Sequence, residues 1–483
     1  MNFLSRRQFL YFSASSAGAI LLSQCQSGQT KNTFSVAKNQ TQKVYRSLDG
    51  LLAVELEASY QKINLGNRQA YLLTYNGQVP GPRLEAKPGD TVQINFTNNL
   101  NQPTNLHYHG LHISPTGNAD NVFLEIPPGE TFKYEFTIPK NHPAGTFWYH
   151  PHLHGLVAEQ LFGGLAGLFI VRGDLDEIPQ IKAAQAEFLV LKDFELDRNG
   201  RIAPPFHMMQ MMGREGELVT VNGQLNPTLS LAQGGLLRLH LVNASTSRFY
   251  RLTLENHPLY LIATDGGSLS EPVEVKELLL SPGQRAEVLV RGEQEPGQYR
   301  LLNLPYDRGG MGMMGRRGMM GRNFSDSPEI LATLAYSGSR ALLPLPEQLI
   351  PVETLPEPET VRRFELNHAM APGRGMIFLI NGQIFNPNRI DTRVRLNTVE
   401  DWEITNTGVM DHPFHIHVNH FQIISRNGRK SPLRAWKDTV IISPGETVRI
   451  RTRFADFTGK TVYHCHILDH EDLGMMGTLE ILE

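Results

Sequence analysis

The chain has 483 residues, enough for about three domains of ordinary size. Its formal net charge of −3 at pH 7 is too small to indicate nucleic acid or an anionic membrane as a partner. The only two cysteines are Cys25 and Cys465, so we expect no disulfide. Fold and function must therefore be inferred from patterns along the chain.

The N-terminal segment is typical of protein export. The sequence SRRQFL from Ser5 precedes an apolar, small-residue stretch that runs to Leu22. This order favours a twin-arginine signal peptide over residues 1–30 rather than a membrane helix, with a cytosolic basic N-terminus as the alternative. It implies the twin-arginine export machinery as a partner and a periplasmic location. The sequence LSQC ending at Cys25 suggests a lipoprotein cleavage site, which Gln directly before Cys fits poorly.

Two short motifs recur three times in the same order and indicate three consecutive domains. Asn-Gly-Gln begins at Asn76, Asn222 and Asn381. A Pro-Gly motif follows as PPGETFKYEF from Pro127, SPGQRAEVLV from Ser281 and SPGETVRIRT from Ser443. We place the domains at residues 43–175, 180–340 and 358–483.

Within the repeats, apolar residues alternate with polar ones, as at Phe132, Tyr134 and Phe136. This alternation predicts half-buried strands rather than helices, and frequent Gly and Pro residues mark the turns between them. The sequence therefore predicts an all-β protein of three antiparallel Greek-key sandwiches.

Histidines recur in pairs with one residue between them, which places both rings of a pair on one face of a strand. The four pairs are His107 with His109, His150 with His152, His415 with His417, and His464 with His466. Eight imidazoles are enough for three copper ions that share a cluster. One such pair could be solvent-facing, but four pairs beside a Cys motif indicate a metal centre.

The segment HCHILDHEDLGMM from His464 combines two kinds of metal site. On a strand, Cys465 points to the opposite face from the two histidines beside it. With His470, one further His and the weak thioether of Met475, Cys465 gives the ligand set of a blue-copper electron-transfer site. The unpaired His412 is the candidate for the missing ligand. An electron on the Cys465 sulfur then needs to cross only its own backbone to reach a paired His.

The repeats differ in the ligands they carry. Tyr149-His150-Pro151-His152 in the first repeat aligns with Tyr463-His464-Cys465-His466 in the third, whereas the middle repeat has Arg300-Leu301-Leu302-Asn303 and no ligand. Copper is therefore expected in the third domain and at its interface with the first. We expect the second domain to act as a spacer that shapes access.

These residues resemble the multicopper oxidases, because HYHG, WYHPHLH, HPFHIH and HCHxxxHxxxxM match all four copper motifs of that family. The resemblance covers nearly the whole chain after the leader and implies cupredoxin-like domains with four copper ions. It implies a type 1 copper held by His412, Cys465, His470 and Met475, and a type 2 copper held by His107 and His415. It implies two type 3 coppers, one held by His109, His150 and His466 and the other by His152, His417 and His464. The nearby His112, His154 and His420 match no ligand position.

The resemblance also implies one-electron oxidation of a reductant at type 1 copper and four-electron reduction of O2 to water at the three-copper cluster. Because that reaction consumes protons, Asp120 and Glu471, which match family positions, are candidate proton relays. The alternatives are a turn Asp and a solvated Glu. Asp411 could orient the adjacent imidazole of His412 or a bound reductant.

Methionines gather in two runs, at Met208–Met212 and at Met311–Met320. Thioethers are soft ligands that suit Cu(I), which favours a cuprous substrate and a role in copper homeostasis. Arg316 and Arg317 argue against metal capture by the second run, whose alternative is a flexible loop without function. Met410 matches a substrate-side position in the copper-efflux subgroup.

We therefore expect a monomeric periplasmic oxidase of Cu(I), or of phenolic and other organic reductants, coupled to O2. A laccase that acts on phenols alone shares every copper ligand and stays open. A copper store needs no electron path, and the family members that serve cell division as scaffolds lack the copper ligands. Copper nitrite reductase, with two such domains per chain, fits less well.

Overall fold

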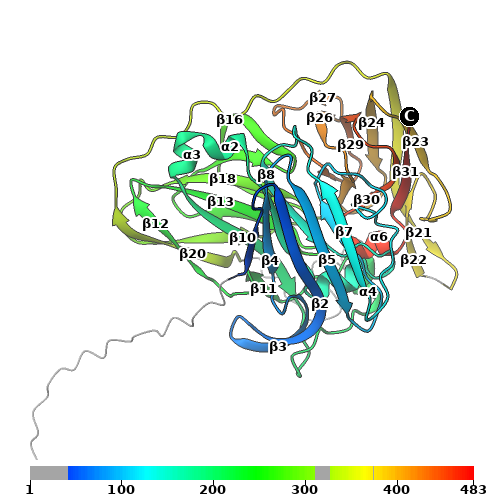
Figure 1. Ribbon diagram of the computed structural model, residues 1–483, viewed down its shortest axis with the longest axis horizontal. Helices are drawn as coiled ribbons and strands as arrows, with labels where there is room; N and C mark the ends of the chain where they lie inside the picture. Colours follow the sequence, from blue (N-terminus) through cyan, green and yellow to red (C-terminus); the bar gives the residue numbers. More distant parts are fainter. Residues whose placement is uncertain (1–41, 310–326, 374) are drawn as a thin grey trace, which may run out of the picture. The chain divides into compact units, whose positions relative to one another are not determined.

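The computed structural model describes residues 42–309, 327–373 and 375–483. The predicted signal peptide at residues 1–30 lies outside this part of the chain, and so does the methionine run at Met311–Met320. Strands dominate the described residues and form six sheets in three pairs (Figure 1). The predicted all-β fold with three consecutive cupredoxin-like sandwiches is confirmed.

The first sandwich uses nine strands. One sheet has the order β1 (Val44–Arg46), β4 (Gly81–Ala86), β9 (Gly167–Val171), β8 (Gly145–His150), β6 (His107–His109). The other has the order β3 (Arg68–Tyr75), β2 (Leu51–Leu65), β5 (Thr91–Asn99), β7 (Thr131–Thr137).

The second sandwich uses eleven strands. One sheet has the order β11 (Leu218–Val221), β10 (Gln185–Phe194), β13 (Leu236–Asn243), β18 (Arg285–Arg291), β15 (Leu259–Thr264), β16 (Gly267–Val275). The other has the order β12 (Thr228–Gln233), β20 (Glu329–Ser339), β19 (Gln298–Leu304), β14 (Tyr250–Leu254), β17 (Leu278–Leu280).

The third sandwich also uses eleven strands. One sheet has the order β22 (Gly375–Ile380), β21 (Thr360–Ala371), β24 (Thr398–Asn406), β29 (Thr447–Phe454), β26 (Phe421–Arg426), β27 (Arg429–Lys430). The other has the order β23 (Thr392–Arg395), β31 (Met476–Leu482), β30 (Gly459–Cys465), β25 (His412–Ile416), β28 (Thr439–Ile442).

Short helices connect the sandwiches and their strands: α1 (Val157–Gly163), α2 (Asp174–Glu177), α3 (Pro179–Ala183), α4 (His207–Met212) and α6 (Leu468–Asp472). Among the described residues, no helix combines the length and the apolar character needed to cross a membrane.

The sheets are mixed, whereas the sequence predicted antiparallel ones. β2 and β5 run parallel, and so do β10 with β13 and β21 with β24. The reason is the Greek-key path, in which the chain leaves one sheet and crosses to the opposite one before it returns. β4, for example, lies in the other sheet and precedes β5, so β5 re-enters beside β2 in the same direction.

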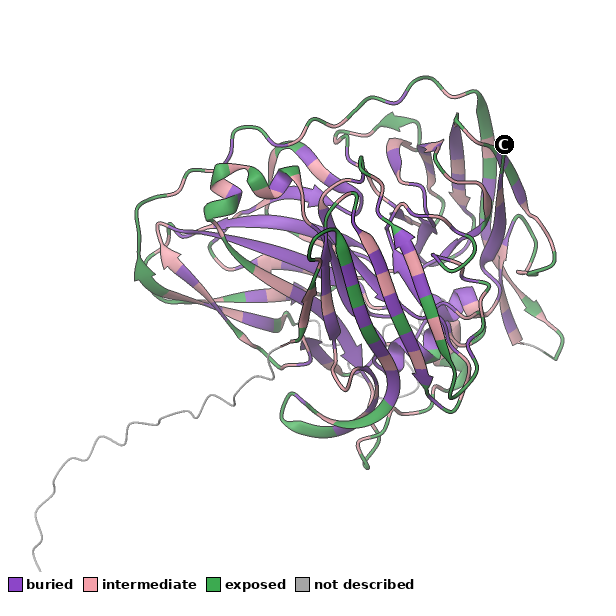
Figure 2. Cartoon of the chain, in the orientation of Figure 1, coloured by how far each residue is buried: buried purple, intermediate pink, exposed green. Residues whose placement is uncertain are grey.

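The predicted alternation of buried and exposed residues holds where one face of a strand meets solvent. On β5, Val92, Ile94 and Phe96 are buried while Asn95 is exposed, and Figure 2 shows the same striping on β2 and β7. Each buried side chain of this size contributes about 1.5–3 kcal/mol. β8 is buried along its whole length because its outer face packs against β13 of the second sandwich.

Strand pairing brings the histidine motifs together. His107 on β6 lies opposite His150 on β8, and His415 on β25 lies opposite His464 on β30. Each predicted pair therefore has a second pair directly beside it in its own sheet.

Candidate metal centres

The residues of the predicted blue site meet where β30 ends and α6 begins. The Cys465 sulfur lies 3.3 Å from Nδ1 of His412 and 3.8 Å from Nδ1 of His470, and all three side chains are fully buried. The backbone places Met475 beside them, since its N–H donates to the carbonyl of His470 and its carbonyl accepts from the N–H of Cys465. The Met475 side chain is also fully buried. The structure thus brings all four predicted residues together.

The ring of His470 is held in one orientation. Nε2 of His470 lies 3.2 Å from the carbonyl oxygen of Met211, to which it donates, so Nδ1 is left as the lone-pair donor facing Cys465. The same ring stacks on Phe378, with 3.8 Å between ring centroids. Burial lowers the pKa of His412 to about 3, which keeps its imidazole neutral, as metal binding requires. Burial raises the pKa of the Cys465 thiol, so a nearby cation is needed to form the thiolate.

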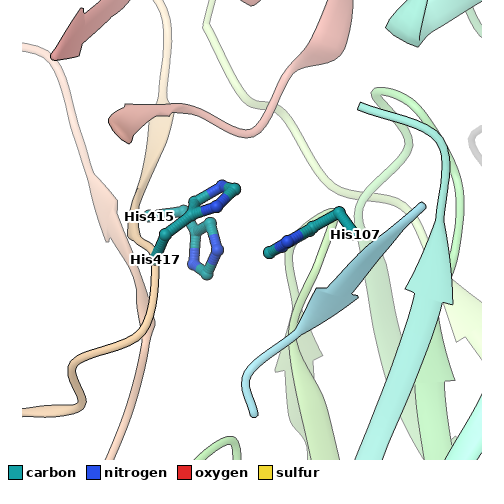
Figure 3. A group of neighbouring side chains, drawn as sticks. All are labelled: His107, His415 and His417. Carbon is teal, nitrogen blue, oxygen red and sulfur yellow. The ribbon is translucent and has the colours of Figure 1, made fainter. Parts of the chain in front are cut away.

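The eight paired histidines form one buried cluster between the first and third sandwiches. Figure 3 shows His107 of the first sandwich facing His415 and His417 of the third. The rings of His107 and His417 stack with 3.9 Å between their centroids, and those of His109 and His415 with 4.0 Å. Donor atoms of His107, His415 and His417 all lie within 4.8 Å of one another.

Three of these rings converge through their Nε2 atoms. Nε2 of His464 lies 3.2 Å from Nε2 of His152 and 3.0 Å from Nε2 of His417. These are the residues predicted for one type 3 copper. The three predicted for the other, His109, His150 and His466, lie with ring centroids 4.9 to 5.9 Å apart.

Most of the predicted ligand histidines have a buried ring nitrogen without a hydrogen-bond partner. Among the described residues, buried ring nitrogens that make no hydrogen bond occur in seven predicted ligands, His107, His109, His150, His412, His415, His417 and His466, and also in His240 and His368, which are not predicted ligands. Leaving so many buried polar atoms unpaired would be costly in a protein without a bound ion. Imidazole, thiolate and thioether donors together suit copper. The residues therefore fit the ions that the resemblance implies.

In His109, His150 and His464, a hydrogen bond at the far side of the ring decides which nitrogen faces the cluster. In His150 and His464, Nδ1 donates a hydrogen bond to a backbone carbonyl, which leaves Nε2 for a metal ion. His109 is reversed, because its Nε2 lies 3.2 Å from Oδ1 of Asp438 and its Nδ1 is free. Asp438 also accepts from Nδ1 of His415 through its backbone carbonyl, at 2.9 Å. Sequence reasoning missed Asp438, because its partner His109 is 329 positions away along the chain.

Both predicted proton carriers are buried beside the cluster, so neither is a solvated surface acid. Asp120 contacts Nδ1 of His107 at 2.9 Å and accepts from the N–H of Tyr108 at 2.9 Å. Burial raises the pKa of Asp120 to about 8. Glu471 lies 3.1 Å from Nδ1 of His464 and 3.7 Å from Nδ1 of His152, and burial raises its pKa well above the usual value.

Other sequence candidates lie elsewhere. The carboxylate of Asp411 accepts a hydrogen bond from the hydroxyl of Tyr306 at 2.7 Å. His112 contacts the carbonyl of Val418, and His420 the carbonyl of Gly110.

The second sandwich is more than a spacer, contrary to the sequence-based expectation. It supplies the Met211 carbonyl to His470, and Arg214 forms a buried ion pair with Asp469 at 2.7 Å. It also places Arg285 against Asp438 at 2.6 Å. Ligand motifs could not reveal these contacts, because none of the three residues from the second sandwich is a predicted copper ligand.

Comparison with known proteins gives a consistent picture. Three models described as multicopper oxidase match residues 57–176, 191–315 and 354–483. The multicopper oxidase mco of Staphylococcus epidermidis is 31% identical over 456 residues, which cover 89% of this chain and 88% of that protein. The cell division protein FtsP of Proteus mirabilis is 29% identical, with 99% of this chain and 98% of that protein covered.

Among solved structures, the multicopper oxidase of Campylobacter jejuni, described as a metallo-oxidase, is similar with a TM-score of 0.81 and 33% identity. The similarity covers 92% of this chain and 94% of that one. Both sequence and structure therefore support one assignment over nearly all of the described residues: the chain belongs to the multicopper oxidase family.

Proposed function

We propose that the protein is an exported oxidase that takes single electrons from Cu(I), or from a phenolic or other organic reductant, and delivers four of them to O2. When bound, copper at the Cys465 site would accept the electrons one at a time, and copper in the histidine cluster would supply the four-electron chemistry. The observation that carries the proposal is the position of Cys465. Its sulfur meets His412 and His470, while the histidines on either side of it belong to the cluster.

The protein provides a short covalent link between the two centres. Cys465 is bonded directly to His464, whose Nε2 lies within 3.2 Å of Nε2 of both His152 and His417. Cys465 and His464 are both fully buried, so solvent does not reach this link. A copper store would not need such a connection.

Asp120 and Glu471 are suited to supply protons on the cluster side. Burial raises the pKa of both, so that in the absence of a nearby cation each would hold its proton at neutral pH. A cation bound at His107 would lower the pKa of Asp120 toward neutrality, where a proton relay is most effective.

The surroundings of His470 favour Cu(I) as a reductant. Its Nε2 donates to the carbonyl of Met211, which belongs to α4, a six-residue helix with four methionines. Met208 on this element is 47% exposed, so its thioether is open to an ion in solution. Soft sulfur donors favour Cu(I) over organic molecules. A laccase acting on phenols is the second candidate, since a planar organic reductant could also approach the His470 ring.

Export to the periplasm by the twin-arginine pathway, and a role in copper homeostasis, are part of this proposal. They are supported by the sequence SRRQFL from Ser5 and by the methionines near His470.

A steady-state comparison tests the proposal: O2 uptake is recorded with Cu(I) and with a dimethoxyphenol as reductant, in the copper-loaded protein. We expect both to be oxidised, Cu(I) at the lower concentration. Met208→Leu with Met209→Leu keeps apolar volume but removes two thioethers, so it should slow Cu(I) oxidation at low free copper while the phenol rate serves as the internal control. Unchanged Cu(I) oxidation at low free copper would favour the laccase. If the loaded protein oxidises neither, the proposed oxidase function is refuted, and a role in cell division, as in the name of its FtsP relatives, becomes the alternative.

A further inference from the structure

We propose that Arg285, in the second sandwich, positions the histidine cluster by holding the Asp438 carboxylate against His109. The inference rests on the proposed copper chemistry and assigns the second sandwich a part in building the cluster. Arg285 contacts no predicted ligand itself and acts through Asp438.

Asp438 is the group that orders two cluster rings at once. Its Oδ1 lies 3.2 Å from Nε2 of His109, and its backbone carbonyl lies 2.9 Å from Nδ1 of His415. An anionic oxygen at Nε2 of His109 keeps the proton there, so Nδ1 carries the lone pair that faces the cluster. The hydroxyl of Thr439 donates to the same oxygen at 2.9 Å and helps to fix it.

Arg285 holds this carboxylate with a complete set of hydrogen bonds. Its Nη1 and Nη2 donate to the two oxygens of Asp438 at 2.8 and 2.6 Å, a bidentate pair. The remaining donors reach the carbonyls of Thr146 at 3.1 Å, Gly283 at 3.1 Å and Asp265 at 2.6 Å. All five N–H groups of the guanidinium are therefore satisfied. Because Thr146 belongs to the first sandwich and Asp438 to the third, one side chain joins all three.

Two glycines show how closely the backbone approaches this pair. A Cβ atom at Gly110, where φ is +86°, would lie 2.1 Å from Nη2 of Arg285. A Cβ atom at Gly283, where φ is +84°, would lie 2.7 Å from the ring of His466. Only glycine fits such positions without displacing the guanidinium or a cluster ring. The space around the cluster is therefore shaped by Arg285 and its neighbours as well as by the ligands.

Charge balance explains why the residue must be arginine. Arg285 is fully buried, and so is Asp438 at 1% exposure. Lysine would keep the charge but lacks the planar fork and two of the five donors.

The test measures copper in the cluster rather than turnover. Arg285→Lys, Asp438→Asn and the uncharged double variant Arg285→Gln with Asp438→Asn are loaded with copper and dialysed against a graded chelator series. Copper per chain and the electron paramagnetic resonance signal of the non-blue copper are recorded beside the blue absorption band. Arg238→Lys is the matched control, because Arg238 forms a buried pair with Glu287 in the same sheet, at 2.6 Å, without contacting a predicted ligand.

We expect the Arg285 and Asp438 variants to hold cluster copper about 10- to 100-fold more weakly than the parent, with an altered resonance signal and an unchanged blue band. Arg238→Lys should match the parent. The double variant leaves no unpaired charge, so it should fold and still bind weakly, because no group then fixes His109. Cluster copper held as tightly in all variants as in the parent would overturn the inference. Weak binding in the singles but parental binding in the double would also overturn it, since only charge balance would then matter. A parent that binds no cluster copper would instead refute the proposed function.

Discussion

The anchoring of α6 can be tested through Arg214 and Asp469. Asp469 immediately precedes His470, and its carboxylate accepts from the backbone N–H of Arg214 at 2.8 Å and from the guanidinium at 2.7 and 2.9 Å. Both residues are buried, at 6% and 2% exposure. Arg214→Met leaves a buried carboxylate without its cation, which costs about 3–5 kcal/mol. This is a large part of the roughly 5–15 kcal/mol that usually stabilises a folded domain. Because α6 carries His470 and Glu471, we also expect weaker copper binding at the Cys465 site.

The assay is urea unfolding followed in the same samples by far-ultraviolet circular dichroism and by the blue absorption band. Lys182→Met is the control, since the pair of Lys182 with Glu177 is exposed, and exposed pairs contribute little. Arg214→Met with Asp469→Leu removes both charges and should recover most of the lost stability. If Arg214→Met unfolds at the same urea concentration as Lys182→Met and keeps its blue band, the pair does not anchor α6.

Three further outcomes are expected. Cys465→Ser should abolish the blue colour and the oxidation of every reductant while cluster copper stays, as visible absorption, metal analysis and O2 uptake would show. If Asp120 supplies a proton, Asp120→Asn should slow reoxidation by O2 by about 10²–10⁴-fold, with reduction of the blue site unchanged in stopped-flow measurements. An unaltered rate of reoxidation would mean that Asp120 is a structural residue. Burial lowers the pKa of His142 to about 3 in the folded protein. Below pH 6.5 the unfolded chain therefore binds a proton that the folded chain does not, and the free energy of unfolding falls as the pH falls. From pH 7 to pH 5 the loss is about 2 kcal/mol, and His142→Asn should show a correspondingly flatter pH dependence of urea unfolding.

The features that sequence predicted well depend on short-range periodicity. Alternation with a period of two predicted the strands, and the same period predicted that His107 and His109 share a face. The Cys465 motif predicted its partners because β30 and α6 are neighbours in the chain, so His470 and Met475 return to the sulfur after one turn. The parallel strand pairs were missed because local alternation is the same whichever direction a neighbour runs.

The features that sequence missed depend on distant partners. Asp438 looks like an ordinary residue before a strand, and only the fold places it against His109. Arg285 did have a signal, since the repeated Pro-Gly motif has Thr131 in the first repeat and Thr447 in the third at the corresponding position. Arg285 therefore places a cation where the other two repeats have a small hydroxyl. Such a cation in a buried strand is a signal for a buried anion nearby.

The second sandwich shows why loss of copper ligands need not mean loss of a role in the metal centres. Arg214 and Arg285 each extend from it to a buried carboxylate of the third sandwich, Asp469 and Asp438 respectively. One carboxylate precedes the blue-site ligand His470 in the chain, and the other holds a cluster ring. Without the second sandwich, both buried carboxylates would lose these cations. Each carboxylate lies beside a predicted ligand, His470 or His109, that must keep a fixed position. The ligands therefore lie in the first and third sandwiches, whereas the cations that balance the two buried carboxylates come from the second.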